Sequence, residues 1–176
     1  MKFRHPPQET VKYWLNYEPE IGIFTWRLSP TPRIKKGQKA GGIRRNGYCM
    51  IGLRGHGQIL AHRLAWIYVH GMIPDRMEID HINRDPGDNR LENLRLATSS
   101  QQKMNKRVQR NSRSGLKGAY YHACRSGMKW RSQIKVGGKL IFLGYFPTAE
   151  DAHEAYVAAS KSYFGEFHPD ALSEAS

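Results

Sequence analysis

The residues best suited to chemistry lie between Met77 and Arg95. An apolar-alternating run ends in Asp80-His81, a turn rich in Asn, Asp, Pro and Gly follows, and Asn93 lies beyond that turn. A carboxylate offers a hard oxygen ligand to a divalent cation, and an adjacent histidine can deprotonate water near neutral pH. An asparagine across a hairpin can hold the imidazole in one orientation. An isolated Asp-His pair would also suit a surface hairpin, but the surrounding pattern favours a metal-dependent nuclease site.

The local pattern predicts a hairpin followed by a helix around these residues. The expected elements are a strand over Met77–His81, a loop to Glu92, a strand over Leu94–Ala97, and a helix from Ser99 to about Lys106 that is capped by Thr98 or Ser99. Because nothing indicates zinc or disulfides, this unit cannot stand alone. The elements from Thr10 to His70 must therefore pack on it.

The motif resembles the HNH endonuclease family, in particular the phage and intron homing endonucleases. The resemblance rests on Asp80-His81, Asn93-Leu94-Arg95 and the run from Ala97 to Gln101, and it implies the ββα-metal fold of those nucleases. It implies that His81 is the general base, that Asp80 binds the metal, and that Asn93 orients His81.

The resemblance also implies a second metal ligand on the helix, at Gln102, where relatives usually carry Asn. Glutamine has the same carbonyl oxygen on a longer stem, so it can still reach a cation. The departure also leaves open weakened or lost metal binding. Asn105, three residues further along the helix, is a less favoured substitute.

The charge pattern indicates a polyanionic partner. In 176 residues, 28 Lys and Arg oppose 15 Asp and Glu, which gives a net charge of +13. The stretch from Ile21 to Pro74 has nine basic and no acidic residues, and the stretch from Asn93 to Ala149 has twelve basic and no acidic residues. Six of the 15 acids lie between Asp75 and Glu92. An acid-rich segment between two basic segments is more typical of a DNA-binding protein with a cation site than of a protein that is basic throughout.

Cysteines and apolar runs exclude other classes. Cys49 and Cys124 lie far apart and form no Cys-x-x-Cys pair, so no structural zinc or disulfide scaffold is expected. No apolar run approaches the roughly 18 residues of a membrane span, and the N-terminus lacks a signal-peptide core. We expect a cytoplasmic protein that acts at the nucleoid of a bacterial host, and the resemblance implies a phage origin.

Several elements are expected before the motif. They are a helix over Gln8–Tyr17, a strand over Ile23–Arg27, a basic loop over Ser29–Gly42, a hairpin with arms Gly47–Arg54 and Gln58–Leu60, and a helix over Ala61–His70. The basic loop is either a phosphate contact, which we favour, or a solvated loop. His62 is expected to be structural or a phosphate contact rather than catalytic.

A polar, basic segment over Val108–Lys117 has no apolar periodicity and is expected to be a linker that lies along DNA. The expected contacts in and just before it are Lys106, Arg107, Arg110 and Arg113.

A second unit follows the linker. Strands are expected over Gly118–Cys124, Lys129–Val136 and Lys139–Phe146, with turns at Ser126-Gly127 and Gly137-Gly138, and then a helix from Ala149 to about Phe164 that is capped by Thr148. In the middle strand, alternation places Trp130, Ser132, Ile134 and Val136 on the core face. Lys129, Arg131, Gln133 and Lys135 then share the other face, which could contact DNA or simply face solvent.

This unit is similar to the APETALA2/ethylene-response-factor DNA-binding domain. The similarity rests on Gly118, Lys129-Trp130, Ile134, the run from Leu143 to Phe146, the run from Thr148 to Ala152, Ala155-Tyr156 and Gly165. It implies that the sheet enters the major groove and that Tyr120, His122, Arg125, Lys129, Arg131, Gln133 and Lys135 lie on DNA. Plant members carry arginines where Tyr120 and His122 stand, so a different base sequence is expected.

Together these patterns predict an α+β protein: a ββα-metal nuclease module, followed by a three-stranded antiparallel sheet packed on one helix. The expected domains are an HNH nuclease domain over residues 1–107 with its core motif at 77–107, a linker over 108–117, an APETALA2-like domain over 118–168 and a tail over 169–176. The expected activity is site-specific cleavage of double-stranded DNA with one Mg²⁺ or Mn²⁺ ion and no obligate protein partner. Two alternatives stay open. One is a DNA-binding protein whose nuclease site has decayed, which Gln102 favours. The other is an RNA-binding module, against which the sequence shows no aromatic-rich RNA-binding signature.

Overall fold

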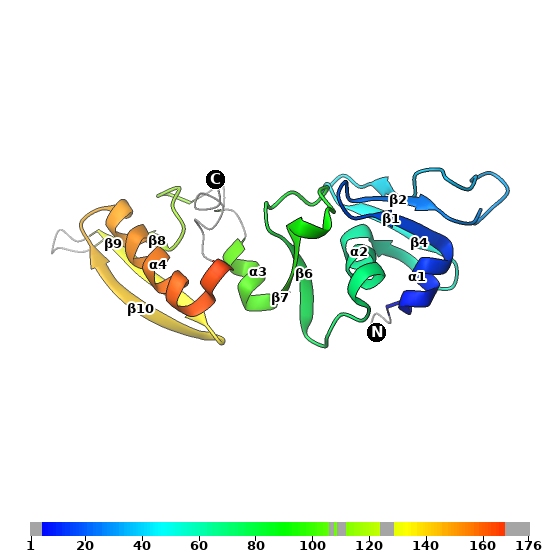
Figure 1. The fold of residues 1–176 in the computed structure, drawn as a ribbon. Coiled ribbons are helices and arrows are strands. Elements are labelled where there is room, and N and C mark those ends of the chain that lie inside the picture. Colours follow the sequence, from blue (N-terminus) through cyan, green and yellow to red (C-terminus); the bar gives the residue numbers. More distant parts are fainter. Residues whose placement is uncertain (1–4, 106–107, 109–111, 124–128, 168–176) are drawn as a thin grey trace. The chain divides into compact units, whose positions relative to one another are not determined.

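The computed structural model describes residues 5–105, 108, 112–123 and 129–167, and Figure 1 labels their helices and strands. The described chain is a mixed α and β structure. It divides into two compact units, Met1–Ala97 and Thr98–Ser176. No helix among the described residues combines the length and the apolar character needed to cross a bilayer.

The N-terminal unit builds small sheets around two helices. Its elements are α1 (Gln8–Trp14), β1 (Leu15–Glu18), β2 (Ile23–Trp26), β3 (Gly42–Ile43), β4 (Cys49–Leu53), β5 (Gly57–Leu60), α2 (Ala61–His70), β6 (Met77–His81), the 3₁₀ turn η1 (Leu91–Asn93) and β7 (Leu94–Thr98). β1 pairs with β2, β4 lies between β3 and β5, and β6 pairs with β7.

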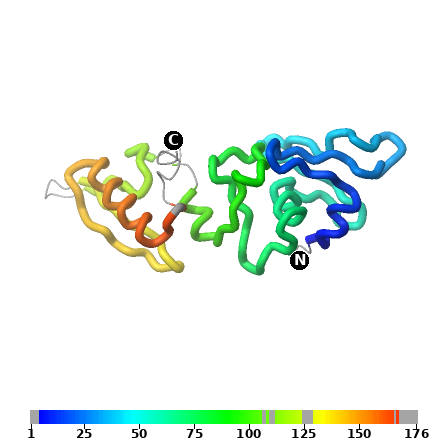
Figure 2. The backbone as a smooth tube through the Cα atoms, in the orientation of Figure 1, coloured from blue at the N-terminus to red at the C-terminus, as the bar shows by residue number. Residues whose placement is uncertain are grey.

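The core of this unit anchors the strand that carries the Asp-His pair. α1 and α2 lie against each other, as the tube in Figure 2 traces. Val11, Leu64 and Ile67 from these helices are at most 1% exposed, and Ile79 from β6 joins the same apolar cluster. The residue directly before Asp80 is therefore held in the core, which limits the movement of Asp80 and His81.

Two expectations for this unit were wrong. The first helix ends at Trp14, and Leu15–Glu18 forms β1, whose Leu15 and Tyr17 pair with Trp26 and Phe24 of β2. Leu15 and Tyr17 are buried and the residues between and after them are exposed, so pairing with β2 overrides helical propensity. The basic loop also ends in a short strand, β3, which the sequence did not indicate.

The C-terminal unit is a three-stranded sheet with a helix on one face. It contains α3 (Ser99–Asn105), β8 (Ala119–Tyr121), β9 (Trp130–Val136), β10 (Lys139–Phe146), α4 (Ala149–Phe164) and the 3₁₀ turn η2 (Gly165–Phe167). The strands are antiparallel in the order β10-β9-β8, and α4 packs against all three (Figure 1).

Small residues let α4 lie close to the sheet. Ala149 and Ala152 pack with Ala119 of β8, and Ser132 and Ile134 of β9 are at most 1% exposed. A Cβ atom at Gly118, which has a φ of +79°, would overlap the Tyr156 ring. Thr148 caps the helix, because its Oγ1 accepts a hydrogen bond from the Asp151 N–H at 3.1 Å.

The helix α3 groups with the C-terminal unit, whereas the sequence assigned it to the nuclease domain. Its residue Met104 accepts a hydrogen bond at Sδ from the Tyr156 hydroxyl, at 3.1 Å. Thr98 caps α3: its Oγ1 accepts from the Gln101 N–H at 3.3 Å, while its own N–H donates to Gln101 Oε1 at 2.8 Å.

Candidate active site

Asp80 and His81 form the end of β6, and both are buried. Their exposed fractions are 8% and 6%. In β6 the last three residues are all buried. Ile79 enters the core, Asp80 lies against Arg95 of β7, and His81 lies against Asn89 of the following turn. Their immediate surroundings therefore set their chemistry more than bulk water does.

The imidazole of His81 is positioned by Asn89. His81 Nε2 lies 3.4 Å from Asn89 Oδ1. A carbonyl oxygen can only accept, so this contact favours the tautomer with the proton on Nε2 and the lone pair on Nδ1. Asn89 is itself fixed: its Nδ2–H donates to the Gly87 carbonyl at 3.1 Å, and its own carbonyl accepts from the Tyr17 hydroxyl at 2.7 Å.

Two further rings pack around His81. The ring of His62, from α2, lies edge-on at 4.8 Å between centroids, and the Tyr48 ring lies 6.0 Å away. Burial lowers the pKa of His62 to about 3, helped by His81 and Arg63. Burial also lowers the pKa of His81, although the contact with Asn89 and the nearby carboxylates, chiefly that of Asp80, oppose this effect. Both imidazoles are therefore neutral near pH 7, and His81 is in the form that can accept a proton.

Asp80 lies beside an arginine that the sequence did not single out. Arg95 of β7 donates from Nε to Asp80 Oδ2 at 3.2 Å, and both side chains are only about a tenth exposed. The pairing restricts the orientation of the Asp80 carboxylate.

Asn93 organises the turn rather than the imidazole. Its Oδ1 accepts from the Asn83 N–H at 2.9 Å, and its Nδ2 donates to Asn83 Oδ1 at 3.0 Å and to the Asp88 carbonyl at 2.8 Å. The asparagine whose side chain lies against the imidazole is Asn89. Asn89 lies in the acid-rich turn between His81 and Asn93. No spacing rule in the sequence distinguishes it from Asn83 or Asn93.

The proposed metal ligands come from different units. Asp80 lies in the N-terminal unit, and Gln102 lies partly exposed in α3 of the C-terminal unit. The described part of the chain holds no cluster of three or more His, Cys, Asp or Glu that could bind a metal ion. Mg²⁺ commonly binds through one or two carboxylates and keeps several waters. A buried carboxylate such as Asp80 therefore fits an ion shared with substrate phosphate, but not an all-protein cage.

The predicted DNA-binding residues lie along the face of the sheet that α4 leaves open. Arg131, in the middle of this face, pairs with Tyr120 of β8 and with Tyr145 of β10. Gln133 and Lys135 follow it on β9, and His122 extends the pairing beyond β8, since its N–H donates to the Lys129 carbonyl at 2.7 Å. Arg113 stacks on the Tyr121 ring at 3.6 Å. Lys106, Arg107, Arg110 and Arg125 lie outside the described residues.

Aromatic residues on this face were missed from the sequence. Phe142 and Tyr145 of β10 are 50% and 41% exposed, and their rings lie 5.1 Å apart. The Arg131 guanidinium lies 5.4 Å from the centre of the Phe142 ring. The strand alternation of β10 could have revealed them, because Phe142 lies opposite Gln133.

Comparison with known proteins identifies the segment that holds this site. Residues 60–104 match the HNH endonuclease family. The match begins just before His62, and it includes Asp80, His81, Asn89 and Arg95.

Three known proteins are similar to this chain. Protein 3.8 of Escherichia phage T7 is 35% identical over 78 residues, which are 44% of this chain and 63% of that protein. An uncharacterized HNH endonuclease, L560, of Acanthamoeba polyphaga mimivirus is 29% identical over 112 residues, 63% of this chain and 56% of that protein. A solved structure of DNA binding and cleavage by the HNH homing endonuclease I-HmuI is 25% identical with a TM-score of 0.39, and covers 49% of each chain. The chain thus spans less than two thirds of the relatives that it matches.

Proposed function

We propose that the chain is a DNA endonuclease that hydrolyses phosphodiester bonds with a divalent metal ion, Mg²⁺ or Mn²⁺. The observation that carries this proposal is the buried Asp80-His81 pair, with His81 Nε2 held against Asn89, inside the segment that matches the HNH endonuclease family. The acid-free basic stretches on both sides support DNA as the substrate.

In the proposed reaction, His81 accepts at Nδ1 the proton of the attacking water, while Nε2–H remains on Asn89 Oδ1. Neutral His62 lies edge-on to the ring and restricts its rotation. Asp80 and Gln102 would hold the metal ion, which supplies charge stabilisation to the phosphate and to the leaving 3′ oxygen. Arg95 holds the Asp80 carboxylate from the adjacent strand.

We propose that the open face of the C-terminal sheet binds DNA. Arg131 and Gln133 can donate to base edges, and Lys135 can contact phosphate. Tyr120, His122 and Lys129 flank them. We infer that this face and the basic segment before it select where cleavage happens, in the manner of an APETALA2-like domain.

A supercoiled plasmid tests the activity. Wild-type protein with Mg²⁺ or Mn²⁺ should nick or linearise it, EDTA should abolish cleavage, and Asp80→Asn should lower the rate at a fixed metal concentration because one carboxylate ligand is lost. If wild-type protein binds DNA and never cuts it with either metal, the decayed-site alternative, which Gln102 favours, replaces this proposal.

A further inference from the structure

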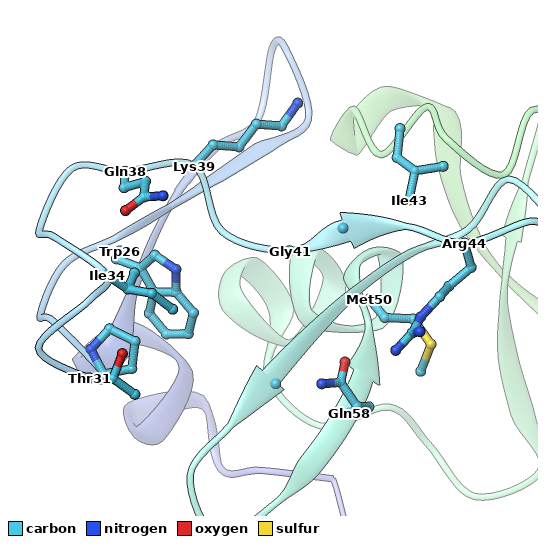
Figure 3. Close-up of a pocket in the computed structure, with 13 residues that line it drawn as sticks. Trp26, Thr31, Ile34, Gln38, Lys39, Gly41, Ile43, Arg44, Met50 and Gln58 are labelled. Carbon is cyan, nitrogen blue, oxygen red and sulfur yellow. The ribbon is translucent and has the colours of Figure 1, made fainter.

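The N-terminal unit contains a hollow that the nuclease reaction does not use. It measures about 560 Å³ and lies between the segment that follows β2 and the sheet β3-β4-β5 (Figure 3). Its lining comprises Trp26, Pro30, Thr31, Ile34, Gln38, Lys39, Gly41, Gly42, Ile43, Arg44, Met50, Gly52 and Gln58.

The lining combines cations, amides and apolar side chains, and it contains no acid. Arg44 supplies positive charge to the space, and Gln58 points its amide into it (Figure 3). The backbone of Lys39 belongs to the wall, while its ammonium points to the other side of β3. Among the described residues neither cation forms an ion pair. Ile43 is 73% exposed at the rim. Such a lining suits a ligand that alternates anionic phosphate with the apolar faces of sugars.

Backbone hydrogen bonds hold the wall that carries Lys39 in place. Trp26 N–H donates to the Gln38 carbonyl at 2.9 Å, and Gly37 N–H donates to the Trp26 carbonyl at 2.7 Å. Ala40 N–H donates to the Phe24 carbonyl at 2.8 Å. Because these bonds tie the segment to β2, the site is built before any ligand arrives, which lowers the entropy cost of binding.

The opposite wall leads directly to the candidate active site. Arg44 N–H donates to the Tyr48 carbonyl at 2.8 Å, and the Tyr48 ring packs on His62 and His81 at 5.6 and 6.0 Å. Arg44 is therefore bonded through its backbone to a residue whose ring packs on His81.

We propose that this hollow binds the sugar–phosphate backbone of DNA near the candidate active site, with Arg44 contacting a phosphate inside it and Lys39 contacting one on the other side of β3. The inference rests on the proposed function, because it assigns the DNA contact of that same nuclease unit. It assigns no base contact to the hollow, so it predicts that the contact is independent of sequence.

Binding should be measured on the full chain in a His81→Ala background, so that DNA is bound without cleavage. The probe is a fluorescent duplex of mixed sequence, titrated by anisotropy at several salt concentrations. Lys39→Ala and Arg44→Ala should each weaken binding and lower the slope of log affinity against log salt by about one. Arg54→Ala is the matched control, because Arg54 is an exposed arginine on the β4–β5 turn and lies outside the hollow.

A second variant tests the space itself. Gly42 has a negative φ, and a Cβ there meets nothing within 4 Å, so Gly42→Trp fills the hollow without backbone strain. It should weaken DNA binding several-fold while leaving thermal stability close to that of wild type.

Three results would overturn the inference. One is an unchanged affinity and salt slope in all three variants while Arg54→Ala behaves like them; cleavage by wild-type protein would then still support the proposed function. Another is a loss of affinity in the His81→Ala parent when inorganic phosphate replaces chloride at constant ionic strength, with no loss in the three variants, because it would assign the hollow to a free anion. The third is no binding of any duplex by the parent protein, which would remove the proposed function as well.

Discussion

The imidazole of His81 depends on groups that reach it from three separate segments. Asn89 comes from the turn after β6, His62 from α2 and Tyr48 from the turn before β4. The sequence assigned the orienting role to Asn93, and this assignment stays a prediction; the side chain of Asn89 is the one seen against the imidazole. Residue type and spacing identify the asparagines of a turn, whereas the fold of that turn decides which one faces the imidazole.

Asn89 and Asn93 should therefore fail in different ways. Asn89→Ala should lower turnover about 10- to 100-fold with little change in DNA affinity, because His81 loses the group that fixes its tautomer. Asn93→Ala should mainly destabilise the turn, by about 1–3 kcal/mol, because it removes the hydrogen bonds of the buried Asn93 side chain to the Asn83 N–H and the Asp88 carbonyl. Single-turnover cleavage and urea unfolding separate the two effects. Equal turnover of Asn89→Ala and wild type would contradict the assignment.

Among the proposed metal ligands, Gln102 is the one whose residue type departs from the family pattern. Its amide oxygen can serve as a neutral ligand, so Gln102→Ala should raise the metal concentration needed for half-maximal cleavage, about 10-fold or more. Gln102→Asn should retain cleavage, because it keeps the amide on a shorter stem. Metal titrations of the cleavage rate measure both. Identical titration curves for Gln102→Ala and wild type would exclude Gln102 as a ligand.

At the scale of elements, the sequence predicted α2, β6, β10 and α4 well. These elements show strong apolar periodicity and clear end signals, such as Gly71 after α2 and Thr148 before α4. It missed β1 and β3, which exist because neighbouring strands provide hydrogen-bond partners. Short strands carry too few residues for their alternation to be distinguished from a helix end or a loop.

The contact between α2 and β6 should make stability depend on pH. The pKa of His62 is about 3 in the folded state, because the ring is buried beside His81, Tyr48 and Arg63, and about 6.5 when unfolded. Between these values the unfolded chain binds the extra proton, so stability is complete above pH 6.5 and falls as the pH drops towards 3.

His62→Phe removes this proton linkage while keeping a ring against His81. The pH dependence of the unfolding free energy below pH 6.5 should then flatten by about 1.4 kcal/mol per pH unit. Urea unfolding at a series of pH values, followed by tryptophan fluorescence, measures the slope. A variant with the parent's slope would show that His62 is protonated in the folded protein.

The open face of β8, β9 and β10 should determine sequence preference. Gln133 lies in the middle of that face, and its amide can bond bidentately to an adenine edge, which is worth about 1–3 kcal/mol of discrimination. Gln133→Ala should therefore change the bases selected from a randomised duplex pool. Lys135→Ala should weaken all sequences alike if Lys135 contacts phosphate. A pool selected by Gln133→Ala that matches the wild-type pool would remove base reading from this position.

At the scale of the whole molecule, the charge pattern indicates the class of partner, a polyanion, whereas the Asp80-His81 motif indicates the chemistry. The acid-free stretches coincide with the segments that carry the hollow and the open sheet face, and the acid-rich segment coincides with the turn that covers His81. Composition could predict a polyanionic partner. It could not place Arg44 in the hollow or Lys39 beside β3, because both positions depend on how the segment after β2 pairs with that strand.

The domain boundaries expected from the sequence stay a prediction, and the packing of the described chain adds a different division. The segment around Val108–Lys117 was expected to separate the domains because it is polar and aperiodic. The contacts instead divide the chain at Ala97 and Thr98, since α3 packs with the elements that follow it, and Met104 accepts the Tyr156 hydroxyl hydrogen bond. Local composition reports flexibility and polarity, but the packing partners of a short helix are a tertiary property.

The most direct test of the central claim is the single-turnover rate of DNA cleavage by wild-type protein and by His81→Ala, at saturating metal and with DNA fully bound. If His81 is the base, the rate should fall about 10²- to 10⁴-fold while the affinity for DNA stays the same. If His81→Ala cuts as fast as wild type, the proposed site is not the one that cleaves DNA.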